Sequence, residues 1–147
     1  MATDIMRREK SNGISSTILY LSMPSSPWSS ATLMPERGEV WLANLNPRRA
    51  TEPGKRRPVL IVQAQALLDA GYPSIIVIPL TTNLIDDTEP LRIRVPAQAS
   101  VRRDSDLLVD QIRAIDNRRL VEGPLARLGA AAMERVAVAI REVLDIS

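Results

Sequence analysis

The segment NPRRATEPGKRR, residues 46–57, gathers cations densely enough to bind an anion. The cations are Arg48, Arg49, Lys55, Arg56 and Arg57, and the one carboxylate among them is Glu52. Like charges this close repel one another unless they extend into solvent or meet a polyanion. A guanidinium group matches two phosphate oxygens at once, so we expect a phosphate chain as the partner, with a solvated loop as the alternative.

Two residue types are missing, and their absence restricts the chemistry. The 147-residue chain contains no cysteine and no histidine. A disulfide framework is therefore excluded, a zinc site would have to be built from carboxylates alone, and we expect neither a metal nor a cofactor. Histidine is also the usual proton carrier near neutral pH, so acid–base steps would fall to Asp, Glu, Tyr, Lys or Arg.

Hydrophobic patterns predict several short strands followed by one helix. The expected strands lie at 38–45, 58–63, 74–80, 91–96, 105–116 (one or two strands) and 120–128. The last should be a bent edge strand, because Pro124 cannot donate to a ladder. After these strands, apolar residues recur at the spacing of a helix; they are Met133, Val136, Ala137, Ile140, Val143 and Leu144. These elements predict a mainly β, α+β fold, in which a small, partly open β-barrel or curled sheet carries a C-terminal amphipathic helix.

Side chains in two of these strands could contact a nucleic acid or only support the fold. Arg92 and Arg94 share one face of the expected strand 91–96, where they could line a phosphate groove or form a solvated face beside acidic neighbours. Its apolar face consists of Leu91, Ile93 and Val95. Trp41 could stack on a base, but its apolar surroundings favour burial in the core.

The chain divides near Met34. Residues 1–33 carry clusters of Ser and Pro without a sustained period, so we expect a disordered extension or a wrongly assigned start, with a secretory signal as the alternative. Residues 34–147 form the one expected domain. No apolar run is long enough to span a bilayer, so we expect a soluble protein.

Four separated motifs carry a resemblance to a known family. They are RGEVWLANLNP, TEPGKRRPVLIVQ, IPLTTN and LLVDQIRAIDNRRL. In this order and spacing, from about Arg37 to the C-terminus, they resemble the MazF/PemK family of bacterial toxin ribonucleases. The resemblance implies an SH3-like β-barrel of the CcdB/MazF type and a cytoplasmic homodimer. It also implies an mRNA interferase, a metal-independent endoribonuclease that cuts single-stranded RNA at short sequences and is inhibited by an antitoxin with an acidic C-terminal segment.

The resemblance assigns roles to residues of the motifs. Arg57, directly before proline in RRPV, matches the catalytic arginine of the family, and Thr81 in PLTT matches its catalytic threonine. Glu52 matches an acidic residue ahead of that arginine. The residues expected to bind RNA are Arg48, Arg49, Lys55, Arg56, Thr82 and Asn83. Without the resemblance, the two threonines would be ordinary β-branched residues at a strand end.

Metal-free RNA cleavage explains these residue types. The neighbouring 2′-hydroxyl attacks phosphorus, which leaves a 2′,3′-cyclic phosphate and a 5′-hydroxyl. Glu52 would act as general base, Arg57 would hold the charge that builds on the phosphorane, and Thr81 would bond a phosphate oxygen. Asn44 replaces an acidic residue common in the family, which leaves the base role more exclusively to Glu52, and Pro53 replaces the usual Gln or Gly.

A second hypothesis assigns the same fold a function without hydrolysis. CcdB-type toxins bind DNA gyrase, and a fold alone does not decide between the two. A gyrase-binding role would depend on the C-terminal helix, whereas the intact basic loop and the PLTT stretch favour the ribonuclease. An inactive RNA-binding module is a weaker third possibility. The apolar residues in REVLDIS widen the helical stripe and favour a homodimer.

Overall fold

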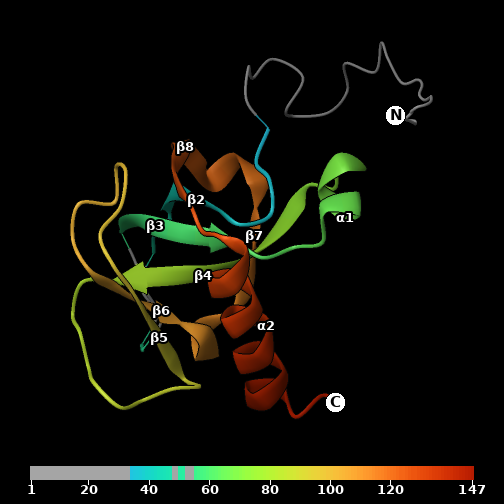
Figure 1. The fold of residues 1–147 in the computed structure, drawn as a ribbon. Helices are drawn as coiled ribbons and strands as arrows, with labels where there is room; N and C mark the ends of the chain where they lie inside the picture. Colours follow the sequence, from blue (N-terminus) through green and yellow to red (C-terminus); the bar gives the residue numbers. More distant parts are fainter. Residues whose placement is uncertain (1–33, 48–49, 52–54) are drawn as a thin grey trace. The chain divides into compact units, whose positions relative to one another are not determined.

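The computed structural model describes residues 34–47, 50–51 and 55–147, which form a curled sheet with two helices (Figure 1). The strands are β2 (Glu39–Asn44), β3 (Arg56–Ile61), β4 (Ser74–Thr81), β5 (Arg92–Val95), β6 (Ser105–Leu108), β7 (Arg113–Asp116) and β8 (Leu120–Arg127). The helices are α1 (Gln65–Asp69) and α2 (Ala130–Leu144), and single 3-10 turns lie at η1 (Val109–Gln111) and η2 (Asn117–Arg119).

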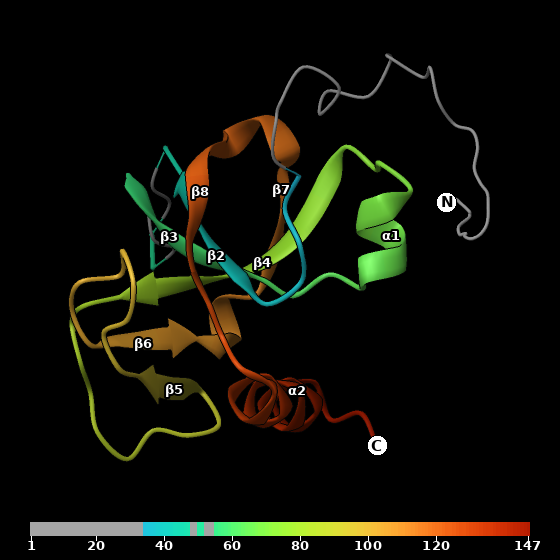
Figure 2. The same cartoon turned by 45° about the horizontal axis from the view of Figure 1, so that its top comes forward.

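Strand β4 is the centre of the sheet. The strand order is β5-β6-β4-β3-β2-β8, and β7 pairs with the first half of β4 while β6 pairs with its end. All of these pairings are antiparallel. Figure 2 shows the strands turning progressively in direction, but among the described strands β5 and β8 do not pair. The mainly β, α+β fold with a terminal helix is confirmed, and the sheet is curled and open.

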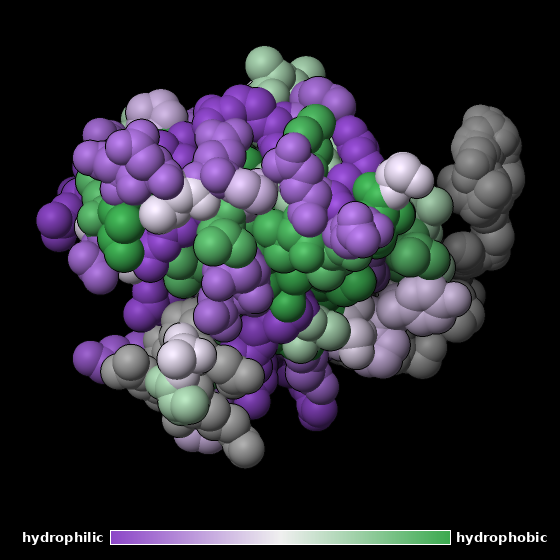
Figure 3. All heavy atoms as spheres, turned by 90° about the horizontal axis from the view of Figure 1, so that it is seen from below, coloured by the Kyte–Doolittle hydropathy of each residue, from purple (hydrophilic) through white to green (hydrophobic). Residues whose placement is uncertain are grey.

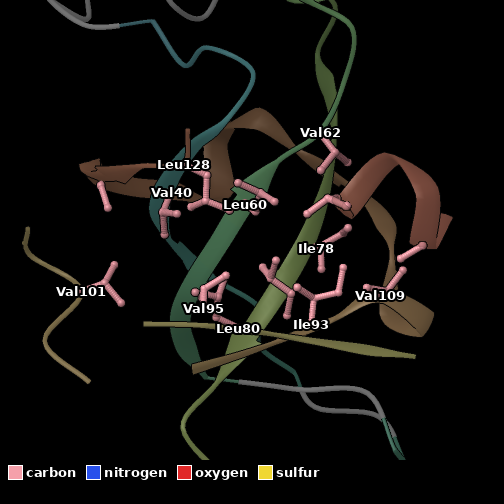
Figure 4. Close-up of a cluster of buried hydrophobic side chains, with 14 residues drawn as sticks. Val40, Leu60, Val62, Ile78, Leu80, Ile93, Val95, Val101, Val109 and Leu128 are labelled. Atoms are coloured by element: carbon pink, nitrogen blue, oxygen red, sulfur yellow. The ribbon is translucent and has the colours of Figure 1, made fainter. Parts of the chain in front are cut away.

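Consecutive apolar residues of β3 and β4 form the centre of the core. Val59, Leu60 and Ile61 are all fully buried, so this half of β3 is covered on both faces. Figure 4 shows Leu60, Ile78 and other apolar side chains gathered between the strands. Each such side chain contributes about 1.5–3 kcal/mol by leaving water. This packing makes β3 and β4 a rigid support for the residues at their ends.

Helix α2 packs one face on this core. Val136 and Ala139 are buried, and the helix ends where Asp145 takes a left-handed conformation with φ of 56°. Partly buried neighbours on the core side are Met133, Ile140 and Val143. The predicted helix is therefore confirmed, and Leu144 at its end is 49% exposed, which fits a stripe wider than the sheet can cover.

Strand β8 is the bent edge strand that the sequence predicts. In the described sheet it pairs only with β2, and the register of that pairing shifts. Gly123 lies so close to the ring of Trp41 that an added Cβ would stand 2.3 Å from its Cδ2 atom. Trp41 is buried, as expected, and its Nε1 donates to Glu39 Oε1 at 3.0 Å. A small residue at 123 is therefore needed for the strand to cover the indole.

Two local features differ from the sequence prediction. Helix α1 was not predicted, because five residues are too few to show a period. Leu91 does not share the buried face of Ile93; it is 49% exposed in a turn, where its N–H donates to the Thr88 carbonyl at 2.8 Å. Residues 1–33 lie outside the described residues, so their disorder stays a prediction. Within the described ranges, no helix has the length and apolarity needed to cross a membrane.

Candidate active site

Antiparallel pairing brings the end of β2, the start of β3 and the end of β4 to one edge of the sheet. Arg57 lies opposite Ala43 of β2. Val59 lies opposite Pro79 of β4, so the residues before Val59 approach those after Pro79. The sequence motifs around Arg57 and Thr81 are therefore neighbours in space.

Arg57 is fixed beside the end of β4 by its own guanidinium. The side chain is half-buried, and Nη1 donates to the carbonyl oxygen of Leu80 at 3.2 Å. Leu80 immediately precedes Thr81, and both belong to β4. The bond therefore holds the predicted catalytic cation next to the predicted catalytic hydroxyl.

Thr81 begins a short turn at the end of β4. Its Oγ1 accepts a hydrogen bond from the Asn83 N–H at 3.1 Å, and Thr82 and Asn83 are exposed. The Asn83 carbonyl in turn accepts from Arg92 Nη1 at 2.9 Å. Because Oγ1 acts as the acceptor here, its hydrogen can still donate to a substrate oxygen.

Lys55 and Arg56 present their side chains to solvent beside Arg57. Lys55 has a positive φ of 65°, and its N–H donates to Asn46 Oδ1 at 2.6 Å. Its carbonyl accepts from the Leu45 N–H at 2.8 Å. Within the described residues, neither cation pairs with a carboxylate. The end of β2 therefore fixes the backbone of this basic edge while the charges stay exposed.

Arg119 is a supporting residue that the sequence analysis missed. From η2 it donates through Nη1 to the carbonyls of Asn44 and Asn46, at 3.0 and 2.5 Å. It lies 75 residues from Asn44 along the chain, inside the fourth motif. Nothing in local spacing could have assigned this partner, although its place in a family motif was a signal.

A buried carboxylate, Asp106 of β6, lies on the other side of Thr81. Asp106 is opposite Thr81 in the β4–β6 pairing and only 1% exposed. Its carboxylate accepts from Arg94 Nε at 2.5 Å, from the Ile85 N–H at 2.9 Å and from Arg92 Nη1 at 3.3 Å. Of the two hypotheses for Arg92 and Arg94, pairing with acidic neighbours is therefore the one the structure favours.

The hydrogen bonds to Asp106 keep it charged. Burial alone raises the pKa of this carboxyl, but the bonds from Arg94, the Ile85 amide and Arg92 outweigh it, so the pKa is lowered below the usual 3.8. The same contact with Asp106, joined by one with Asp86, raises the pKa of Arg94. Asp106 and Arg94 are therefore both charged at neutral pH.

Three predicted site residues fall outside the described ranges. They are Arg48, Arg49 and Glu52. Those that the structure does bring together at the sheet edge are Lys55, Arg56, Arg57, Thr81, Thr82 and Asn83. In the described residues, no three acidic side chains are grouped so that they could hold a metal ion.

Comparison with known proteins places this fold and site in a family. Residues 36–144 match the model of the "PemK-like, MazF-like toxin of type II toxin-antitoxin system". The chain is 31% identical over 118 residues to the endoribonuclease MazF9 of Mycobacterium tuberculosis, covering 77% of this chain and 98% of that protein. It is 32% identical over 107 residues to the endoribonuclease EndoA of Bacillus subtilis, covering 72% and 90%.

Solved structures show the same fold. MazF from Deinococcus radiodurans superposes with a TM-score of 0.66 at 24% identity, covering 78% of this chain and 99% of that one. A mycobacterial endoribonuclease solved with its cognate antitoxin gives a TM-score of 0.61 at 20% identity, covering 77% and 97%. The family match spans most of the chain and includes both the basic edge and the Thr81 turn, and the chain therefore belongs to the PemK-like, MazF-like toxins of type II toxin–antitoxin systems.

Proposed function

We propose that this toxin is a sequence-specific, metal-independent endoribonuclease that cleaves single-stranded RNA. The observation that carries the proposal is the contact of Arg57 with the Leu80 carbonyl, which joins the basic edge to the end of β4 that carries Thr81. Curated relatives that are 31–33% identical to the chain are named endoribonucleases. A cation and a hydroxyl beside each other suit a phosphate that gains charge during reaction.

In the proposed reaction the RNA supplies its own nucleophile. The 2′ oxygen forms a bond to phosphorus as the bond from phosphorus to the 5′ oxygen breaks, which leaves a 2′,3′-cyclic phosphate and a 5′-hydroxyl. Glu52 takes the proton of the 2′-hydroxyl, and water returns a proton to the leaving 5′ oxygen. Arg57 stabilises the phosphorane charge, since a guanidinium holds its proton too firmly to be a good proton donor. Thr81 donates to a phosphate oxygen.

Exposed groups around this centre bind the flanking RNA. Lys55 and Arg56 offer charge to phosphates, and Thr82 and Asn83 offer polar groups to sugar or base edges. Arg48 and Arg49 extend the basic loop in the sequence and are assigned to the same task. Sequence preference then comes from hydrogen bonds rather than stacking, because the chain has no phenylalanine and Trp41 is buried.

A protein antitoxin and a second copy of the toxin are the proposed partners. A MazE-MazF structure from D. radiodurans is also similar to this chain, with a TM-score of 0.62. An acidic C-terminal segment of an antitoxin would suit the exposed Lys55 and Arg56 by charge. The toxin would meet RNA and antitoxin in the cytoplasm.

Exposed apolar side chains support the homodimer. Figure 3 shows apolar atoms gathered near the middle of one face, with polar atoms around them. Val138, Leu144 and Ile146, on α2 and just beyond it, are each at least 40% exposed. Contiguous apolar surface of this kind is covered in most stable assemblies.

The test is cleavage of single-stranded RNA in EDTA by purified toxin. We expect fragments ending in a 2′,3′-cyclic phosphate, and no cleavage where the nucleotide at the cut carries 2′-deoxyribose. Arg57→Ala should lower the rate about a hundredfold or more while RNA binding falls much less. Arg118→Ala, which removes an arginine whose side chain is 80% exposed, is the matched control and should cut normally.

A different experimental result would contradict each part of the proposal. Cleavage of the deoxy-substituted RNA would exclude 2′-hydroxyl attack, and a requirement for added metal would exclude the metal-independent route. RNA left intact by the wild-type protein, together with inhibition of DNA gyrase, would favour the CcdB-type alternative.

A further inference from the structure

Four side chains from three neighbouring strands lie on one face of the sheet beside the candidate active site. Asp106 of β6 is directly opposite Thr81 of β4 on one side and Arg94 of β5 on the other. Residues directly opposite one another point to the same face, with Cβ atoms about 5 Å apart. Arg92 lies two residues before Arg94 and therefore shares that face. The Asp106 carboxylate thus stands between a candidate catalytic threonine and two arginines.

A continuous series of hydrogen bonds leads from Asp106 back to the Thr81 hydroxyl. Arg92 Nη1 donates both to Asp106 Oδ2 at 3.3 Å and to the Asn83 carbonyl at 2.9 Å. The Asn83 N–H then donates to Thr81 Oγ1 at 3.1 Å. Asp106 Oδ2 also accepts from the Ile85 N–H at 2.9 Å, which ties the segment after β4 at a second point.

The two arginines differ in one contact that matters for this arrangement. Arg94 binds Asp106 Oδ1 and Asp86 Oδ1, at 2.5 and 2.9 Å. Only Arg92 also binds the carbonyl of Asn83, within the turn that carries the Thr81 bond. Arg92 is the more enclosed of the pair, with a side chain 20% exposed against 37% for Arg94. Arg94 is therefore a natural control for Arg92.

We infer that Arg92, anchored by Asp106, is a positioning residue that fixes the Thr81–Asn83 turn and so aims the Thr81 hydroxyl at the scissile phosphate. The inference rests on the proposed endoribonuclease function. In this role Arg92 does not touch the RNA. Misplacing a reacting group by about 1 Å can cost on the order of a hundredfold in rate, so the turn needs an anchor outside itself.

The test compares Arg92→Lys with Arg94→Lys on an RNA oligonucleotide of defined sequence. Both changes keep the positive charge, so long-range attraction of RNA is preserved, but lysine has a single ammonium and cannot bridge two acceptors in the same geometry. Arg92→Lys should lower kcat roughly tenfold to a hundredfold with little change in KM, since only binding of the transition state is weakened. Arg94→Lys should change kcat less than about threefold.

A double-mutant cycle shows whether Arg92 acts through Thr81. In the Thr81→Ala background, Arg92→Lys should cost less than about twofold in kcat, because the hydroxyl that it positions is gone. Hydrogen exchange supplies a readout independent of cleavage. The Asn83 amide should exchange faster in Arg92→Lys than in the wild type, with little change in Arg94→Lys.

Several results would overturn the inference while leaving the endoribonuclease in place. One such result is an equal loss of kcat in Arg92→Lys and Arg94→Lys. Another is a double variant in which the losses of kcat from Arg92→Lys and Thr81→Ala simply add. The third is a hydrogen-exchange rate of the Asn83 amide that does not change in Arg92→Lys. A rise in KM at constant kcat for Arg92→Lys would instead make Arg92 an RNA-binding residue. A wild-type protein that cuts no RNA removes the proposed function, and the inference fails with it.

Discussion

Arginines at the start of β3 and on β5 face opposite electrostatic surroundings. On β5, Arg92 and Arg94 share the buried carboxylate of Asp106, and Arg94 also binds Asp86. At the start of β3, Arg56 and Lys55 are exposed, and no carboxylate of the described residues pairs with them. The same type of side chain therefore stabilises structure in one place and presents charge in the other.

The two sets of cations differ in the negative charge that they neutralise. A buried carboxylate is costly to desolvate, so it needs cations around it, and Asp106 has two. Exposed cations that repel one another are tolerated only with solvent or an outside anion between them. The β5 cluster is therefore expected to act on stability and geometry, and the β3 edge on binding and rate.

Removing the buried acid should give the largest effect on stability. Asp106→Ala leaves two arginines without their shared carboxylate and frees the Ile85 amide, so we expect about 3 kcal/mol loss in the free energy of unfolding. Urea unfolding measures it. The matched control is Glu134→Ala, which breaks an exposed Glu134–Arg141 pair on α2 and should change stability little. Equal losses in the two variants would remove the distinction between buried and exposed arginine pairs.

Removing the exposed cations should give an intermediate effect, on RNA binding rather than on folding. The double variant Lys55→Ala, Arg56→Ala should raise KM roughly tenfold and leave the free energy of unfolding nearly unchanged. The slope of log KM against log salt concentration should weaken by about 0.7 for each phosphate that the variant no longer neutralises. Steady-state cleavage at several salt concentrations measures this. An unchanged salt dependence would show that these cations do not meet phosphates.

Acidification should give the smallest effect, and a comparison with Asp106→Asn isolates the part that comes from the β5 cluster. Because the pKa of Asp106 is lowered in the folded state, its contribution to stability is present above the usual pKa of 3.8, which applies to the unfolded chain. That contribution is lost as pH falls through the folded pKa. The stability gap between wild type and Asp106→Asn should therefore narrow below about pH 4 in urea unfolding. A gap that stays constant down to about pH 3 would mean that the carboxyl is not stabilised as an anion.

Much of the sheet was predictable because its signals are local. The apolar run before Gln63 predicts a strand, and β3 ends there with Val59, Leu60 and Ile61 fully buried. Pro124 predicts a bent edge strand, and β8 is one. Where a signal was short or lay at an element's end, the prediction failed, as at helix α1 and at the exposed Leu91.

The sequence predicted the residue types of the candidate site. It did not predict the residues that hold them in place. Arg57 and Thr81 belong to sequence motifs, and the Leu80 carbonyl confirms that they are neighbours. Arg119 reaches Asn44 across 75 residues, and Asp106 reaches Thr81 only through strand pairing. Such partners are set by the register of distant strands, which a local pattern does not encode.

The sequence by itself determined which charges the protein has, which runs must be buried, and that cations gather between the first two strands of the domain. It could not tell an arginine that pairs with a buried carboxylate from one whose charge stays exposed, because both look alike in a polar position. Only the tertiary structure decided this, by placing Asp106 between Arg92 and Arg94 and no described carboxylate beside Lys55 or Arg56. The physical reason is that a charge's role depends on its nearest partners and its burial, and both arise when strands pair.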